Sequence, residues 1–327
     1  MPEELPTRPS ILVVGSVNMD LVLQLPRMPL LGESMVGHQY SRIPGGKGAN
    51  QAVGLARLGA KVTLAGKVGK DADGATLLGL LKQQGVATDY VIEAEGSSTG
   101  LAVIFLDATG QNSVAVFPGA NYEITEDELR TVFAADKFDA VMMQLEVPDQ
   151  VVIATYRFAE KSAIPVFLDA GPARPFPLEQ LWGIDLLSPN ETEVTALTGI
   201  EVKSLADAER AAAKLMTRSG AKAVVIKLGS QGALLRTADG QVEQYRAPQV
   251  EAIDTTAAGD AFTAALLVRY LETGDFREAV PYANFAGALA TTRLGAQPSL
   301  PTAEEIERQR GQWQPRRHFE QDEEVHV

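Results

Sequence analysis

The chain has 327 residues, 45% hydrophobic and 22% charged, as in ordinary soluble globular proteins. Its net charge of −13 argues against nucleic acid or an anionic membrane as a partner. The absence of cysteine excludes disulfides and thiolate metal sites, and the three histidines are too scattered for a histidine zinc site. No window approaches about 18 consecutive apolar residues, so we expect a cytoplasmic protein without membrane spans.

Short apolar runs recur along the chain, and helix-like stretches lie between them. The first run is "ILVVGS" at 11–16, and similar runs begin at 61, 139, 164, 184 and 222. The helix-like stretches cover 47–59, 73–85, 149–162 and 205–220. This alternation predicts an α/β fold with an open, mostly parallel sheet and helices on both of its faces.

Two stretches, at about 20–42 and about 97–120, break this alternation. The second contains "TGLAVIFLDATGQNSVAVFP", which predicts a hairpin with "DATGQN" as its turn. We expect the two stretches to form a small antiparallel β-sheet that serves as a lid, although a hairpin without function fits the pattern equally well. The chain then divides into an N-terminal extension (1–10), an α/β domain (11–310) and a charged C-terminal tail (311–327).

Two polar stretches near the N-terminus could bind a ligand with several hydroxyl groups. "GSVNMD" at 15–20 follows the first strand, and the carboxyl ends of strands are where open α/β sheets bind ligands. Asn18 and Asp20 could hold neighbouring hydroxyls, or could simply form an Asx turn. "PGGKGANQA" at 44–52 places glycines around Lys47 at a helix entrance, either to approach a ligand closely or to make a plain turn.

The stretch "DTTAAGDAF" at 254–262 joins a polar turn to an apolar helix. The free amides and partial positive charge of a helix N-terminus attract anions, and small residues let a phosphate approach them. Asp260 would sit in the first turn, where it could accept a proton from a hydroxyl group. The alternative is that Asp260 is an ordinary acid at a helix start.

Two further turns follow predicted strands. In "SPNETEVTALTG" at 188–199, Asn190 and Glu193 lie three residues apart on one helical face, either near the water shell of Mg²⁺ or as an N-cap pair. "KLGSQG" at 227–232 could run along a nucleotide or form a β-turn.

In combination, these stretches resemble the PfkB carbohydrate kinases over nearly the whole chain. "GGKGANQA", "PNETE", "LGSQG", "DTTAAGDAF" and "GAQPS" stand in the family's order, and five such motifs in series are specific although each is weak alone. The resemblance implies ATP-dependent phosphorylation of a primary hydroxyl of a sugar, namely the 5-hydroxyl of D-ribose.

The resemblance also implies site residues. Asp260 matches the catalytic base, and the amides of Ala257, Ala258 and Gly259 match the anion hole. The sugar positions are Asn18, Met19, Asp20, Gly46, Lys47, Gly48, Ala49, Asn50, Glu146 and Asp260. The nucleotide positions are Asn190, Lys227, Leu228, Gly229, Ser230, Gln231, Gly232, Gly259, Asp260 and Asn284. Ribose-phosphorylating relatives often have a neutral residue where Lys227 stands, so its side chain either contacts phosphate or points to solvent.

By the same resemblance, Mg²⁺ accompanies ATP and Glu193 lies near its water shell. An activating K⁺ would be bound beside the anion hole by Asp254, Thr256, Ala290, Arg293, Gly295 and Ser299. A homodimer through the β-lid is also expected.

Three alternatives remain at this stage. The first is a kinase of the same architecture for another sugar, a sugar acid or a nucleoside. The second is a non-catalytic sugar-binding relative, which would not need the "AAGD" run. The third is a dinucleotide-dependent dehydrogenase, which ranks low because no G-x-G-x-x-G follows the first strand.

Overall fold

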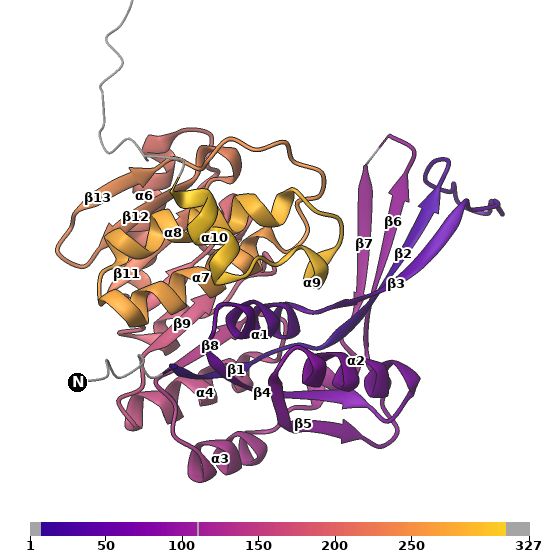
Figure 1. Cartoon of the computed structure of the whole chain (residues 1–327), viewed down its shortest axis with the longest axis horizontal. Helices are drawn as coiled ribbons and strands as arrows, with labels where there is room; N and C mark the ends of the chain where they lie inside the picture. The colour runs from indigo at the N-terminus through magenta and orange to yellow at the C-terminus, as the bar shows by residue number, and fades with distance from the viewer. Residues whose placement is uncertain (1–7, 110, 312–327) are drawn as a thin grey trace, which may run out of the picture.

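The computed structural model describes residues 8–109 and 111–311 (Figure 1). The N-terminal extension and the charged tail expected from the sequence therefore lie outside the described residues, except for 8–10 and 311.

The main sheet has nine strands in the order β13-β12-β11-β10-β9-β8-β1-β4-β5. It is parallel from β11 to β5, whereas β12 and β13 add an antiparallel edge, which confirms the predicted mostly parallel sheet. The bounds are β1 Ser10–Val14, β4 Lys61–Gly69, β5 Val86–Ala94, β8 Ala140–Gln144, β9 Val166–Asp169, β10 Leu186–Ser188, β11 Ala223–Lys227, β12 Ala233–Thr237 and β13 Val242–Tyr245.

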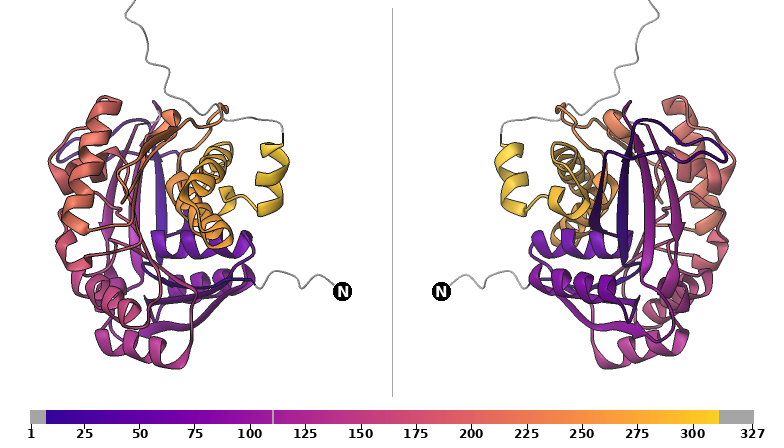
Figure 2. Two further views of the ribbon diagram at one scale, coloured as in Figure 1. Left: turned by 90° about the vertical axis from the view of Figure 1, so that its left-hand side faces the viewer. Right: turned by 90° about the vertical axis from the view of Figure 1, so that its right-hand side faces the viewer.

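Helices cover both faces of this sheet (Figure 2). Ile11 and Val13 of β1 face one core with α1 (Lys47–Arg57), α2 (Ala72–Gln83), α7 (Ala258–Thr273), α8 (Phe276–Thr291) and α10 (Ala303–Arg310). Leu12 and Val14 face a second core with α3 (Glu126–Ala135), α4 (Asp149–Lys161), α5 (Glu191–Thr198) and α6 (Leu205–Ser219). The strands are apolar on both sides because both faces are buried. Among the described helices, none has the length and apolar character needed to span a membrane.

A second, four-stranded sheet forms the lid and stands out from the main body (Figure 1). Its order is β3-β2-β6-β7, with β2 Asn18–Leu25, β3 Gln39–Gly45, β6 Gly100–Asp107 and β7 Asn112–Phe117. The outer pairings are antiparallel, as predicted, but the central β2–β6 pairing is parallel. The expectation of a purely antiparallel sheet was therefore wrong. Since β2 and β6 each leave the main body and return through a hairpin partner, these two strands must run in the same direction.

Candidate active site

Asp260 lies in the first turn of α7, where the sequence predicted a base. The helix begins at Ala258, and Ala257 before it has a positive φ of 59°. A left-handed backbone is uncommon for a residue other than glycine and clusters at functional sites. Asp260 itself is only 4% exposed, so its carboxylate is buried at the helix entrance.

Two amide side chains from α1 hold this carboxylate. Asn50 Nδ2 donates to Oδ2 at 3.0 Å, and Gln51 Nε2 donates to Oδ1 at 2.9 Å. Lys47 Nζ lies 3.8 Å from Oδ1. Burial raises the pKa of Asp260 above its ordinary value, although Lys47 and the two amides act in the opposite direction. A carboxylate with a raised pKa at a fixed position is suited to accept a proton.

Glycines allow α1 to approach the loop between β1 and β2. A Cβ on Gly48 would lie 2.6 Å from the backbone of Gly15 and Ser16, and Gly46 has a φ of 88°. The Lys47 amide also donates to Glu146 Oε2 at 3.0 Å. These contacts fix the start of α1 and with it the side chains that face Asp260.

The start of β2 contributes the predicted sugar positions Asn18 and Asp20. Asn18 is buried, and its Oδ1 accepts a hydrogen bond from Asn121 Nδ2 at 2.7 Å. Burial, together with the charges of Glu146 and Asp260, raises the pKa of Asp20 to about 7. The strand pairing places Asn18 opposite Gly45, next to the start of α1.

Two buried side-chain oxygens in this region, on Asn50 and Gln144, lack a partner among the residues that the structure describes. Asn50 Oδ1 has no hydrogen-bond partner among the described residues, and Asn50 is buried, with only 6% of its surface exposed. A buried acceptor without a donor is costly and rare in native proteins. A sugar hydroxyl is a donor that would satisfy it.

A cavity of about 660 Å³ opens on the other side of the α7 entrance. The predicted nucleotide residues that line it are Lys227, Gly229, Ser230, Gly232, Gly259 and Asn284, together with Ala258 of the predicted anion hole. Residues of the 247–252 loop, which had no signal in the sequence, also line it, together with Phe262 from the 254–262 motif. Asn284 Nδ2 donates to the carbonyl of Tyr245 at 2.9 Å, which fixes one side of the cavity.

Several predicted positions do not place their side chains in the site. Met19 and Leu228 pack into the two hydrophobic cores, and Ala49 is fully buried within α1. Gln231 is exposed and does not line the cavity. For Met19, Ala49 and Leu228, only backbone contacts with a ligand are compatible with these positions, because their side chains are apolar and buried.

Asn190 and Glu193 form a capping box at the start of α5. Asn190 Oδ1 accepts from the Glu193 amide at 2.9 Å, and Glu193 Oε2 accepts from the Asn190 amide at 2.7 Å. Glu193 lies near Lys47 as well, since a Cβ on Gly171 would approach both side chains within 2.7 Å. In the described part of the chain, no group of three or more His, Cys, Asp or Glu could hold a metal ion.

Asp254 joins two loops beside the α7 entrance. Its Oδ1 accepts from the Thr256 amide at 2.9 Å, and its Oδ2 accepts from the Gly295 amide at 2.8 Å. Arg293 directs its side chain to Glu305, and the Ser299 hydroxyl donates to the carbonyl of Ala296. Three of the predicted K⁺ positions, Asp254, Thr256 and Gly295, are therefore brought together. Arg293 is compatible with this site only through its carbonyl.

Four polar residues that organise the site were assigned no role in the sequence analysis. These are Gln51, Asn121, Gln144 and Asp169. Asp169 ends the strand β9 in the same way that Asn18 follows β1, so its place at the carboxyl edge of the sheet was a usable signal.

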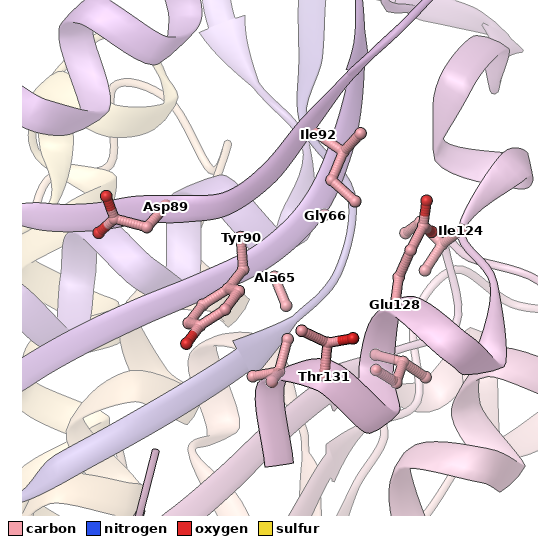
Figure 3. A pocket seen from close by; sticks show the side chains of 10 residues that line it. Ala65, Gly66, Asp89, Tyr90, Ile92, Ile124, Glu128 and Thr131 are labelled. Carbon is pink, nitrogen blue, oxygen red and sulfur yellow. The ribbon is translucent and has the colours of Figure 1, made fainter. Parts of the chain in front are cut away.

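A second cavity, of about 310 Å³, lies between strands β4 and β5 and helix α3 (Figure 3). Its lining includes Ala65, Tyr90, Ile92 and Thr131, and none of the predicted site residues. The Tyr90 hydroxyl donates to Asp136 at 2.7 Å, outside the set of residues that line the cavity. We assign this cavity no part in the chemistry.

This chain is similar to several known proteins over most of its length. Residues 8–303 match the model of the pfkB family carbohydrate kinases. The ribokinase of Haemophilus influenzae is 37% identical over 299 residues, covering 91% of this chain and 97% of that protein. The ribokinase of Bacillus subtilis is 38% identical over 302 residues, covering 91% and 98%. Among solved structures, Arabidopsis thaliana ribokinase complexed with ribose and ATP superposes with a TM-score of 0.84 at 36% identity, covering 92% of this chain and 98% of that one.

Proposed function

Because the chain belongs to the pfkB family of carbohydrate kinases, we propose that it transfers the terminal phosphoryl group of ATP to the 5-hydroxyl of D-ribose. This is the activity of a ribokinase, with D-ribose 5-phosphate and ADP as products. The observation that carries the proposal is the buried Asp260 carboxylate between the polar side chains of α1 and β2 and the cavity of about 660 Å³. The ribokinases that are 37–38% identical over most of the chain support it.

In the proposed reaction, the sugar lies between the start of β2 and the start of α1. Asn18 and Asp20 bind its ring hydroxyls, and Asn50 Oδ1 accepts a hydrogen bond from one of them. Asp260 takes the proton of the 5-hydroxyl as that oxygen attacks the γ-phosphorus. The bond between the γ-phosphorus and the bridging oxygen breaks, and the electron pair leaves with ADP.

The nucleotide lies in the larger cavity. Gly229, Ser230, Gly232 and Asn284 line its wall, and the first amides of α7 face the transferred group. Fixed donors of this kind stabilise charge that develops on the phosphoryl oxygens without having to reorient. Mg²⁺ bound with ATP would neutralise phosphate charge, and Glu193 lies where it could orient the water around the ion.

The K⁺ proposal rests on the two loops that Asp254 ties together. Asp254 and backbone carbonyls of the 254–256 and 290–295 segments would hold the ion, which would stiffen the entrance to α7. The homodimer through the lid and the cytoplasmic location stay predictions.

A coupled assay with ATP, Mg²⁺ and a panel of acceptors tests the proposed function. We expect turnover with D-ribose and lower turnover with 2-deoxy-D-ribose, other sugars, sugar acids and nucleosides. Each acceptor is assayed in K⁺ and in Na⁺, so the same panel reports the cation dependence. Higher turnover with a nucleoside would favour the nucleoside kinase reading, and the absence of turnover with every acceptor would favour a non-catalytic relative.

Substitution of the base gives the first variant test. Asp260→Asn keeps the size of the side chain but cannot accept the proton. We expect kcat to fall by about a hundredfold or more, with D-ribose binding retained. Isothermal titration with D-ribose reports binding independently of turnover. Near-normal kcat in this variant would falsify the assignment of Asp260 as the base.

A further inference from the structure

Asp169 joins the sugar side and the nucleotide side of the site through one buried carboxylate. Its Oδ1 accepts from Lys227 Nζ at 2.6 Å, and its Oδ2 accepts from Lys47 Nζ at 3.2 Å and from Gln51 Nε2 at 2.7 Å. Asp169 is fully buried at the end of β9. Because β10 lies between β9 and β11 in the sheet, the Lys227 side chain reaches across the end of β10 to make this contact.

The Lys227 ammonium group lies at the boundary between this ion pair and the nucleotide cavity. Lys227 lines the cavity, and a Cβ on Gly259 would lie 3.7 Å from Lys227 Nζ. The ammonium group is therefore next to the first turn of α7, where free amides attract an anion. Among the described residues, Asp169 is its only ionic partner within salt-bridge distance. The side chain thus does not point to solvent, which excludes one of the two possibilities left open by the sequence.

Carboxylates surround the two lysines of this cluster, and the charges of Glu193 and Glu146 also act on Lys47. Two ammonium groups, on Lys47 and Lys227, face two carboxylates, on Asp169 and Asp260. Burial alone would raise the pKa of Asp169, but the two lysines hold it below its ordinary value. Asp169 therefore stays ionised, and an ionised carboxylate can hold both ammonium groups in a buried place where an unpaired cation is costly.

We infer that Lys227 binds the terminal phosphate of the nucleotide, and that Asp169 is a positioning residue that holds Lys227 and Lys47 on the two sides of Asp260. The inference rests on the proposed kinase function and adds a cation to the anion hole formed by the α7 amides. A positive charge placed where phosphoryl oxygens gather negative charge stabilises that charge more strongly than neutral amides alone.

A binding series with adenosine, AMP, ADP and ATP tests the role of Lys227. Lys227→Met keeps the length of the side chain and removes its charge. We expect it to weaken ATP binding by about ten- to a hundredfold, as the loss of a charged hydrogen bond does, and to leave adenosine binding unchanged. Lys222→Met is the matched control, because Lys222 pairs with Asp185 at 2.6 Å at the opposite end of the neighbouring strands β10 and β11. It should leave both affinities unchanged.

This series distinguishes an error in the role of Lys227 from an error in the proposed kinase function. Unchanged ATP affinity in Lys227→Met, or an equal loss for adenosine and ATP, overturns the phosphate-binding role while the kinase proposal stands. Failure of the wild-type protein to bind ATP at all contradicts the kinase proposal instead.

Asp169→Asn tests the positioning role. Lys227 loses its only ionic partner among the described residues, and Lys47 keeps only Asp260. We therefore expect KM to rise for D-ribose and for ATP, whereas Lys227→Met raises KM for ATP alone. A purely structural role would reduce the amount of folded enzyme and leave both KM values unchanged. If Asp169→Asn does not fold, we combine it with Lys227→Met. The double variant has no ammonium group at residue 227, so no cation is left buried there without a partner. The KM of the double variant for D-ribose must then exceed that of Lys227→Met, and equality overturns the role of Asp169.

Discussion

At the scale of single residues, the position of Asp20 favours sugar binding but disfavours its own ionisation. The proposed sugar site needs a polar group at the start of β2, but burial and the nearby carboxylates Glu146 and Asp260 raise the pKa of Asp20 to about 7. Near neutral pH the free protein therefore holds Asp20 partly protonated. Burial of the charged Asp20 carboxylate is therefore unfavourable in the free protein. In the proposed complex, hydrogen bonds from the sugar would replace those from water.

This raised pKa predicts a pH dependence of stability. Between about pH 4 and about pH 7, the folded protein keeps a proton on Asp20 that the unfolded chain releases, so this group makes the free energy of unfolding fall as pH rises. At about 1.4 kcal/mol per pKa unit, the loss amounts to a few kcal/mol. We expect Asp20→Asn to gain stability relative to wild type as pH rises through this window. Urea unfolding of both proteins across the window measures it, and a difference that does not change with pH would contradict the assignment.

The sequence predicted the residues that belong to local motifs and missed those defined by contacts between distant segments. Asp260 and Lys47 follow from helix entrances rich in small residues, which can be recognised within ten residues of sequence. Gln51 and Asp169 contact each other across 118 positions. Gln51 lies within the 44–52 motif, but no local pattern shows that it faces Asp169. Their role becomes visible only when the carboxyl ends of β1, β9 and β11 lie along the same edge of the sheet.

At the scale of elements, the entrance of α1 depends on the absence of a side chain at residue 48. A Cβ at Gly48 would lie 2.6 Å from backbone atoms of the β1–β2 loop, and backbone atoms cannot move aside as a flexible side chain can. By contrast, a Cβ at Gly79 of α2 would meet nothing within 4 Å. The two positions are both helical, so they form a matched pair.

We expect Gly48→Ala to destabilise the protein by about 1–3 kcal/mol, as overpacking does, and to raise KM for D-ribose because α1 moves away from β2. Gly79→Ala should be neutral or stabilise by up to about 1 kcal/mol, since alanine favours a helix. Thermal unfolding and steady-state kinetics measure both effects. A Gly48→Ala variant with the stability and KM of Gly79→Ala would show that the close approach is unimportant.

In the lid, the sequence predicts the strands but not the direction in which β2 and β6 pair. The hairpin β6–β7 was predicted from its own residues, because its turn lies within the segment. The pairing of β2 with β6 joins segments about eighty residues apart, and alternation of apolar residues is the same for parallel and antiparallel partners. Strand direction here is decided by where each strand leaves the main body.

At the scale of the whole molecule, the lid leaves apolar side chains uncovered. Val114 and Val116 of β7 are 54% and 53% exposed and, being two residues apart, lie on the same face of the strand. β7 is also an edge strand. Exposed apolar groups next to an unpaired strand edge are typical of surfaces that another chain covers, which supports the predicted dimer.

The double variant Val114→Lys/Val116→Lys tests this assembly. We expect wild type to have the mass of two chains by light scattering and the variant to have the mass of one. The reason is that the introduced lysines of the two copies would face and repel each other. Trp182→Lys, which replaces an apolar residue 62% exposed outside the lid, is the control and should leave the dimer intact. A wild-type protein with the mass of one chain would exclude the lid dimer.

The placement of Asn18 and Asp20 at the root of β2 has a mechanical consequence. The eight residues of this strand extend about 26 Å from the site at roughly 3.3 Å per residue. Under the proposed function, the sugar would bind at one end of this strand. A small tilt of β2 about its sugar-binding end would displace the far end of the strand by several ångströms. A pair of fluorophores, one on the tip of the lid and one on the main body, would turn this enzyme into an optical reporter of its own substrate.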